Sequence, residues 1–285
     1  MNILFPKTLA ALWQAWREHP DASIFAGGTD LFVCLRGKSV QPDVLIGLER
    51  LSELNFISVE GDNLVVGAAV NVEELRNNQA LDSLQVLREA LDSFASPPIR
   101  HSATIGGNLC TASPAGDCLP ALYVLDAIVI LASVTGRREM AVADFIIEPG
   151  RTALAPGEIV AAVKIPLPPR EAITSYSKVG KRKALAIAVT SMASVVIPGS
   201  GRQLSRVRLA WGSVGPTVAT LPETERLLAG KPLTMELLRQ AAAQVAAAVK
   251  PIGDVRSSAA YRRQVAGNLL LKALWPYSNE GRDKT

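Results

Sequence analysis

Three prolines close together, Pro166, Pro168 and Pro169, limit the fold of this chain more than any other feature. Proline has no backbone N–H and restricts the residue before it to extended conformations, so a helix or an inner strand cannot run through such a cluster. We therefore expect a boundary here, with one folded part in front of it and a second part behind it.

The spacing of apolar residues predicts helices and strands on both sides of that boundary. In the first part we expect helices at 8–18, 31–36, 72–76, 84–94 and just beyond residue 117, and strands at 23–26, 43–48, 56–59, 63–67, 127–132 and 158–165. In the second part we expect strands at 175–179, 186–197 and 206–213, followed by helices at 235–249 and 259–274. Strands followed by helices are typical of an α+β layer.

The composition excludes several classes of protein. Apolar residues make up 48% and charged residues 20% of the chain, as in an ordinary globular protein. We see no apolar run long enough for a membrane span and no secretory signal peptide, so we expect a cytoplasmic protein. The densest basic run, Lys178, Lys181, Arg182 and Lys183, has no interleaved aromatic residues, which favours a solvated loop over a nucleic-acid surface.

The residues that usually bind metals or act as nucleophiles are few. The cysteines, Cys34, Cys110 and Cys118, are too few and wrongly spaced for an iron–sulfur cluster or a structural zinc site. The histidines, His19 and His101, have no second ligand at metal spacing. No Ser/His/Asp set can be assembled, so we expect neither a metal site nor a catalytic side chain on this chain.

Two glycine pairs carry most of the chemical information. Gly27-Gly28 follows an apolar strand and precedes Thr29-Asp30, and Gly106-Gly107 precedes Asn108. Each predicts a turn whose backbone N–H groups can approach an anion, followed by a residue suited to cap a helix. Neither pair matches a Walker loop or the GxGxxG fingerprint, so we expect a diphosphate held by neutral donors. By spacing alone, Asp117 fits either a helix N-cap or an acceptor for ribose hydroxyls, and the cap is favoured.

Longer motifs around these glycines resemble a known family. FAGGTDLFV (25–33) and ATIGGNLCTASPAGDCLPAL (103–122) are similar to the two FAD-binding signatures of the flavoprotein subunit of molybdenum hydroxylases, the xanthine dehydrogenase and carbon monoxide dehydrogenase family. The similarity continues through PDVLIGLERLSEL (42–54), EIVAAVKIPLP (158–168) and YSKVGKRKALAIAV (176–189). It implies an α+β fold with a PCMH-type FAD-binding domain in two subdomains, 1–55 and 56–168, and a smaller C-terminal flavoprotein domain, 169–285.

The resemblance also implies roles for individual residues. One side of an FAD pyrophosphate cradle is assigned to Ile24, Phe25, Ala26, Gly27, Gly28, Thr29 and Asp30, and the other side to Thr104, Gly107, Asn108 and Thr111. Asp117 becomes a ribose-side ligand, which reverses the preference from spacing alone. Phe94 and Val160 match apolar positions near the cofactor, and Lys178 matches a lysine that reaches the flavin neighbourhood. The loop 181–185 would lie by the exposed flavin edge, and Leu185 departs from a tyrosine of the carbon monoxide branch, which favours a xanthine dehydrogenase-like protein.

The implied activity is that of an oxidoreductase subunit. A bound flavin supplies its own redox chemistry, which agrees with the lack of a catalytic set. The family pattern implies non-covalent FAD on this chain, [2Fe–2S] centres on an iron–sulfur subunit, the molybdenum cofactor on a molybdopterin subunit, and NAD or another acceptor. We expect no nucleic acid as a partner.

Two other functions remain compatible with the sequence. One is a free-standing flavin oxidase or reductase of the same fold. The other is a non-catalytic assembly protein whose C-terminal helices bind a partner. Arg256, Tyr261, Arg262 and Arg263 could form that contact face, although a solvated helix face is favoured.

Overall fold

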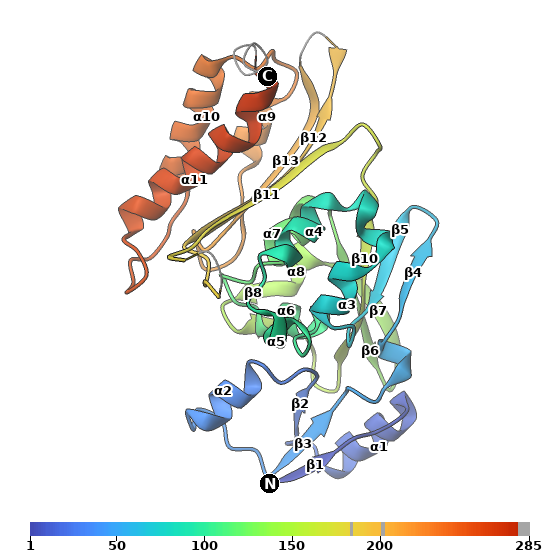
Figure 1. Ribbon diagram of the computed structural model, residues 1–285. Coiled ribbons are helices and arrows are strands. Elements are labelled where there is room, and N and C mark those ends of the chain that lie inside the picture. Colours follow the sequence, from blue (N-terminus) through green and yellow to red (C-terminus); the bar gives the residue numbers. More distant parts are fainter. Residues whose placement is uncertain (183–184, 201–202, 279–285) are drawn as a thin grey trace. The chain divides into compact units, whose positions relative to one another are not determined.

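The computed structural model describes residues 1–182, 185–200 and 203–278. The chain forms two compact units, each built from more than one stretch of sequence. Unit 1 comprises 1–80, 96–112 and 126–166, and unit 2 comprises 81–95, 113–125 and 167–285. The proline cluster lies where the chain finally leaves unit 1. Both units combine helices with sheets (Figure 1), and the expected α+β class is confirmed.

Unit 1 contains a small parallel sheet and a larger antiparallel sheet, with strand orders β1-β3-β2 and β4-β5-β10-β6-β7. Its strands are β1 (Asn2–Leu4), β2 (Ser23–Phe25), β3 (Val44–Gly47), β4 (Ile57–Glu60), β5 (Asn63–Gly67), β6 (Ile128–Ser133), β7 (Gly136–Ala141), β8 (Ile146–Glu148), β9 (Arg151–Thr152) and β10 (Ile159–Pro166). Its helices are α1 (Leu9–Glu18), α2 (Leu31–Arg36), α3 (Val72–Asn77), α5 (Pro97–Arg100), α6 (Ile105–Thr111) and α8 (Val142–Phe145).

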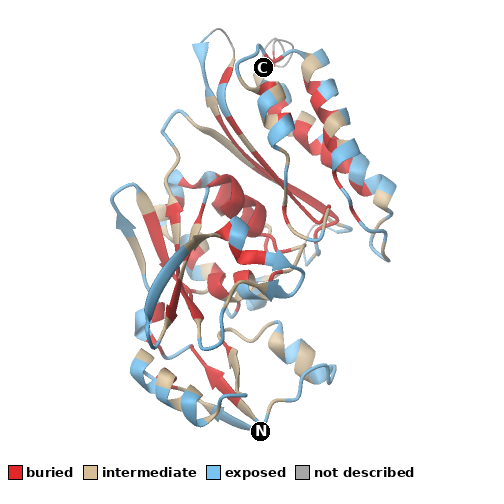
Figure 2. Cartoon of the chain, turned by 180° about the vertical axis from the view of Figure 1, so that it is seen from behind, coloured by how far each residue is buried: buried red, intermediate tan, exposed pale blue. Residues whose placement is uncertain are grey.

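One apolar cluster in unit 1 joins the small sheet to inner strands of the larger one. It contains Leu12 of α1, Ile46 of β3 and Ala161 of β10, all nearly or fully buried. Strands β3 and β10 are buried along most of their length, and Figure 2 shows the buried residues concentrated along the inner strands. This packing fixes the ends of β2 and β10, which carry expected site residues.

Unit 2 is built on one antiparallel sheet of order β11-β12-β13-β14. Its strands are β11 (Ile173–Val179), β12 (Thr190–Pro198), β13 (Leu204–Gly212) and β14 (Ala219–Thr220). Its helices are α4 (Gln85–Asp92), α7 (Leu119–Val124), α9 (Pro222–Leu228), α10 (Met235–Ala248) and α11 (Ala259–Leu274). Helices α10 and α11 cover one face of the sheet (Figure 1), and α4 and α7 pack on its strands as well.

The two faces of this sheet follow from the two-residue period of a strand. Met192 and Trp211 face the core that α10 and α11 complete, and the indole N–H of Trp211 donates to the Ala266 carbonyl of α11 at 3.1 Å. Ser191 and Gly212, one residue away on each strand, lie beside Pro120 of α7 instead. On β11, Lys178 pairs with Ser191 and Ser177 with Met192, so even- and odd-numbered residues of β11 lie on different faces of the sheet.

The structure corrects several expectations about elements. β12 begins at Thr190, four residues later than the sequence predicts, and the strands and the one helix between 133 and 152 were not predicted at all. These pieces are short and one of them, β7, is a charged, largely exposed edge strand, so they lack an apolar period. Among the described residues no helix is both long enough and apolar enough to cross a membrane.

Candidate functional site

The first glycine pair forms a turn between β2 and α2. Gly28 has φ of +68°, a conformation that glycine adopts without strain, and a Cβ there would lie 2.4 Å from the ring of Phe32. Among the described residues, the backbone N–H groups of 27–30 donate to no protein acceptor. Asp30 does not cap α2 as expected, because its side chain makes no cap hydrogen bond. The turn therefore presents a run of free amide donors.

This turn lies directly against the segment that carries the second glycine pair. A Cβ on Gly27 would lie only 1.6 Å from the Ser102 carbonyl oxygen, so the two backbones touch where side chains are absent. The Thr111 hydroxyl also donates to the Asp30 carboxylate at 3.3 Å. Residues more than 70 positions apart in sequence are thus neighbours, as a two-sided cradle requires.

The expectation that Gly106-Gly107 is a second turn with free amides is wrong. Both glycines lie in the first turn of α6, which Thr104 caps by accepting the Gly107 N–H at 3.0 Å. The Gly106 N–H donates to the Ala68 carbonyl, and a Cβ on Gly106 would lie 2.6 Å from the Ala68 Cβ. Gly106 is needed for close packing, because α6 could not approach Ala68 with a larger residue.

Gly107 and Asn108 of α6 have space or an open hydrogen-bonding atom for a ligand. A Cβ on Gly107 would meet only the Thr104 hydroxyl, at 3.0 Å, and open space otherwise. The Asn108 side-chain oxygen is buried and has no hydrogen-bond partner among the described residues. A buried polar atom without a partner costs about 1–3 kcal/mol, so a ligand group that donates a hydrogen to this oxygen is favoured.

Val160 also lies in unit 1, on a strand that is connected to α6. It is 3% exposed and lies on β10 where the pairing with β6 contains a bulge. The adjacent Ala161 carbonyl accepts the Ala68 N–H at 2.9 Å, and Ala68 contacts Gly106. β10 is thus joined to α6 through Ala68, a residue for which the sequence offered no signal.

The remaining expected residues, Phe94, Asp117 and Lys178, lie in unit 2. Lys178 on β11 donates to the Asp117 carboxylate at 2.7 Å and to the Ser93 carbonyl at 2.9 Å. Both charged side chains are about nine-tenths buried, with exposed fractions of 8% and 11%. Phe94 follows Ser93 and is buried. Asp117 does not form the helix cap that its spacing favoured. Cys118 occupies the N-cap position of α7, and the Asp117 carboxylate is paired with Lys178 instead.

Burial dominates the electrostatics of this pair. It raises the pKa of the Asp117 carboxyl from 3.8 to about 6, although the Lys178 ammonium opposes the rise. The second oxygen, Oδ1, is buried and has no donor among the described residues. Asp117 therefore keeps one acceptor free for a hydroxyl or N–H group of a ligand.

Two other expectations can be located. Leu185 is half exposed, but the loop 181–185 contains positions 183 and 184, which lie outside the described residues. Arg262 does not belong to an exposed contact face, because it is 4% exposed. Tyr261 and Arg263 on either side of it are exposed.

The fit to an FAD molecule can be judged from these groups. A diphosphate needs several N–H or O–H donors close together, and the turn at 27–30 supplies free amides opposite the hydroxyl and amide side chains of α6. The nucleotide's hydroxyls need acceptors, and Asp117 Oδ1 is one. Within unit 1 these donors fit a diphosphate, and within unit 2 the free oxygen of Asp117 fits a hydroxyl group.

Comparison with known proteins agrees with this assignment. Residues 1–168 match the family model of the FAD binding domain in molybdopterin dehydrogenase, and residues 175–276 match that of the CO dehydrogenase flavoprotein C-terminal domain. The chain is 34% identical over 266 residues to the nicotinate dehydrogenase FAD-subunit of Eubacterium barkeri, covering 91% of this chain and 90% of that protein.

Solved structures are similar over nearly the whole length. Reconstituted CO dehydrogenase from Oligotropha carboxidovorans has a chain with a TM-score of 0.91 at 28% identity, with 96% of each chain covered. Quinoline 2-oxidoreductase from Pseudomonas putida 86 has one with a TM-score of 0.92 at 25% identity, covering 99% of this chain and 98% of that chain. The chain is therefore an FAD-binding oxidoreductase subunit of the molybdopterin dehydrogenase, or molybdenum hydroxylase, family.

Proposed function

We propose that this chain is the electron-transfer subunit of a heteromeric dehydrogenase and that its FAD diphosphate lies in the cradle of unit 1. The observation that supports this most directly is the contact between Gly27 and Ser102, because it brings the free amides of 27–30 beside the start of α6. The hydrogen bond from Thr111 to Asp30 joins the same two segments.

The cradle would bind the diphosphate largely with neutral donors. The turn from Ile24 to Asp30 supplies backbone N–H groups, and Thr104, Gly107, Asn108 and Thr111 line the other side. Each hydrogen bond to a charged oxygen contributes about 1.5–3 kcal/mol, so about four or five of them can hold a dinucleotide without a metal ion.

The residues of unit 2 have a different task in this proposal. Asp117 accepts a hydroxyl of the cofactor with its free oxygen, and Lys178 balances the carboxylate charge. Phe94 there, and Val160 in unit 1, provide apolar surface near the cofactor. When bound, FAD supplies the redox chemistry, because a flavin can exchange electrons singly with a cluster and in pairs with an acceptor such as NAD.

The partners in this proposal are an iron–sulfur subunit with [2Fe–2S] centres and a molybdopterin subunit that oxidises the substrate. The names of the relatives support such an assembly, since they are an FAD-subunit and medium chains of dehydrogenases. Leu185 favours a xanthine dehydrogenase-like complex. We place the complex in the cytoplasm.

The first experiment is purification of the full chain without its partners. We expect a flavin absorption band, and trichloroacetic acid should release the flavin into the supernatant because it is not covalently bound. A colourless chain that takes up no added FAD would contradict the cradle. Co-purification on a tagged chain should then recover two subunits, one with iron and one with molybdenum. Turnover by the isolated chain would instead favour a free-standing oxidase or reductase.

A further inference from the structure

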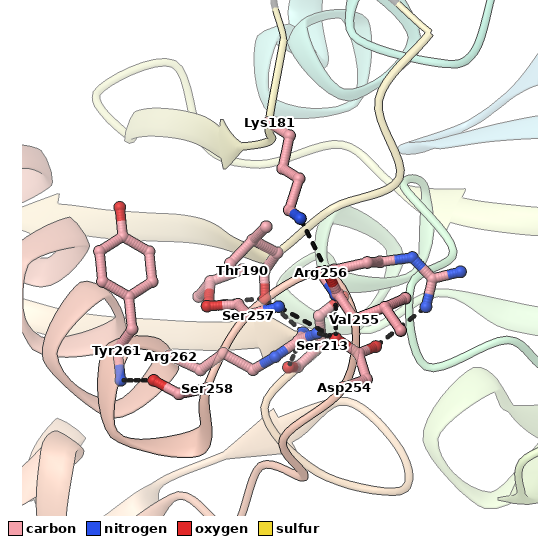
Figure 3. Close-up of polar contacts among 11 residues, drawn as sticks. Lys181, Thr190, Ser213, Asp254, Val255, Arg256, Ser257, Ser258, Tyr261 and Arg262 are labelled. Carbon is pink, nitrogen blue, oxygen red and sulfur yellow. Dashed lines mark hydrogen bonds and ion pairs between the residues drawn. The ribbon is translucent and has the colours of Figure 1, made fainter.

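A buried arginine in unit 2 joins three separate segments of the chain. Arg262 on α11 donates through Nη1 to the Val189 carbonyl at 2.6 Å and to the Ser213 carbonyl at 3.1 Å, and through Nη2 to the Asp254 carboxylate at 2.9 Å (Figure 3). An arginine that is 4% exposed and bonded to two backbone carbonyls has little freedom to move. Its position fixes those two carbonyls.

Asp254, which binds the Arg262 guanidinium, lies in a hydrogen-bonded turn. Asp254 also accepts the N–H groups of Arg256 and Ser257 and a guanidinium hydrogen of Arg256, at 2.9–3.1 Å. Burial alone would raise the pKa of this carboxyl, but those hydrogen bonds and the one from Arg262 outweigh burial and lower the pKa. Asp254 is thus a fixed anion that orients Arg262.

Ser213 connects Arg262 to the Asp117 segment. Its carbonyl accepts from Arg262, and its N–H donates to the Pro114 carbonyl at 2.8 Å. Ser213 has φ of +62°, which is unfavourable for a residue with a side chain, so surrounding contacts must hold it there. A Cβ on the preceding Gly212 would lie 2.5 Å from the Ser191 hydroxyl and 3.1 Å from Pro120. The end of β13 is thus fitted closely against the segment that contains Asp117.

We propose that Arg262 is a positioning residue for cofactor binding, which acts through Ser213 and Pro114 on Asp117. This rests on the proposed role of Asp117 as a ligand of FAD. The C-terminal domain then sets the affinity of the chain for FAD in two ways. Lys178 pairs with Asp117 directly. Arg262 holds Ser213, whose N–H binds the Pro114 carbonyl in the segment that contains Asp117.

The test measures FAD binding to the flavin-free full chain by the quenching of flavin fluorescence. Arg262→Lys should weaken FAD binding about tenfold, because an ammonium cannot serve both carbonyls and the carboxylate in one plane. Arg263→Lys, on the exposed neighbour in the same helix, is the matched control and should leave binding unchanged. Asp117→Asn combined with Arg262→Lys should bind within about twofold of Asp117→Asn alone, since both changes act at the same ligand contact.

A readout without FAD separates positioning from general destabilisation. Hydrogen exchange of the flavin-free chain should speed up in Arg262→Lys at 213–214 and 115–118 and stay unchanged in α10. Additive effects of the two substitutions on FAD affinity, or exchange that rises evenly over unit 2, would overturn the proposal. If Arg262→Lys does not fold, Asp254→Asn is measured instead: about threefold weaker FAD binding supports the proposal, and unchanged binding overturns it. A wild-type chain that binds no FAD contradicts the proposed function, whereas wild-type binding with unchanged variants contradicts only this inference.

Discussion

Replacing Lys178 by methionine tests the buried ion pair, because it removes the charge and keeps most of the volume. Asp117 would then be a carboxylate with 11% of its side chain exposed and neither oxygen bonded to a cation. Breaking a buried pair in this way costs about 3–5 kcal/mol of unfolding free energy when the remaining group stays charged. The pKa of Asp117, already about 6 in the presence of Lys178, should rise further.

The contribution of Asp117 to folding stability depends on pH, and its sign follows from the direction of the pKa shift. Because the folded-state pKa of Asp117 exceeds its ordinary value of 3.8, its contribution to stability is present below about pH 4 and is lost as pH rises through about 6. At about 1.4 kcal/mol per pKa unit, that loss is about 3 kcal/mol in the wild type. In Lys178→Met the pKa of Asp117 is higher, so stability continues to fall as pH rises above about 6. We therefore expect a cost of about 3–5 kcal/mol at pH 8 that falls to about 1 kcal/mol near pH 5, where the carboxyl is protonated.

Urea unfolding of the flavin-free chain between pH 5 and pH 8 measures this cost. Lys164→Met is the matched control: its partner Glu139 is about half exposed, so the cost should stay below about 1 kcal/mol. Adding Asp117→Asn to Lys178→Met should remove most of the pH dependence. A loss of stability in Lys178→Met that is equal at pH 5 and pH 8 would refute the reasoning, because it would mean that Asp117 is not charged and buried at neutral pH.

Four further substitutions test the cradle and the core. Gly107→Asp should abolish FAD retention in a folded chain, since it places a carboxylate against the proposed diphosphate site; normal flavin content in the folded variant would contradict that placement. Gly27→Ala should lower the free energy of unfolding by about 3 kcal/mol or more, measured by thermal unfolding, and should lose FAD, because its Cβ would lie 1.6 Å from a backbone oxygen. In the control Gly107→Ala the Cβ meets only the Thr104 hydroxyl, so the cost should be about 1 kcal/mol. Trp211→Phe should cost about 2–3 kcal/mol in urea, from a lost hydrogen bond and a small cavity, and a change below about 0.5 kcal/mol would exclude that bond as a significant contributor.

The sequence predicted the long elements well. Apolar periodicity located α10 and α11 to within a residue or two, and Gly27-Gly28 was correctly expected to form a turn after a strand. These features depend on neighbours in sequence, so a local pattern is sufficient to predict them. The long signature at 103–122 is specific enough by itself to indicate the family, which the match over residues 1–168 confirms.

Only the tertiary structure decided which groups are free to bind. By sequence Gly106-Gly107 and Gly27-Gly28 look alike, yet the amides of the first pair are bonded to Ala68 and Thr104, whereas those of the second pair are open. Asp117 looks like a helix cap until Lys178, 61 residues later, is brought beside it, and Arg262 looks exposed until the Val189 and Ser213 carbonyls surround it. Hydrogen-bond satisfaction and burial depend on contacts between distant segments, which no local pattern in the chain encodes.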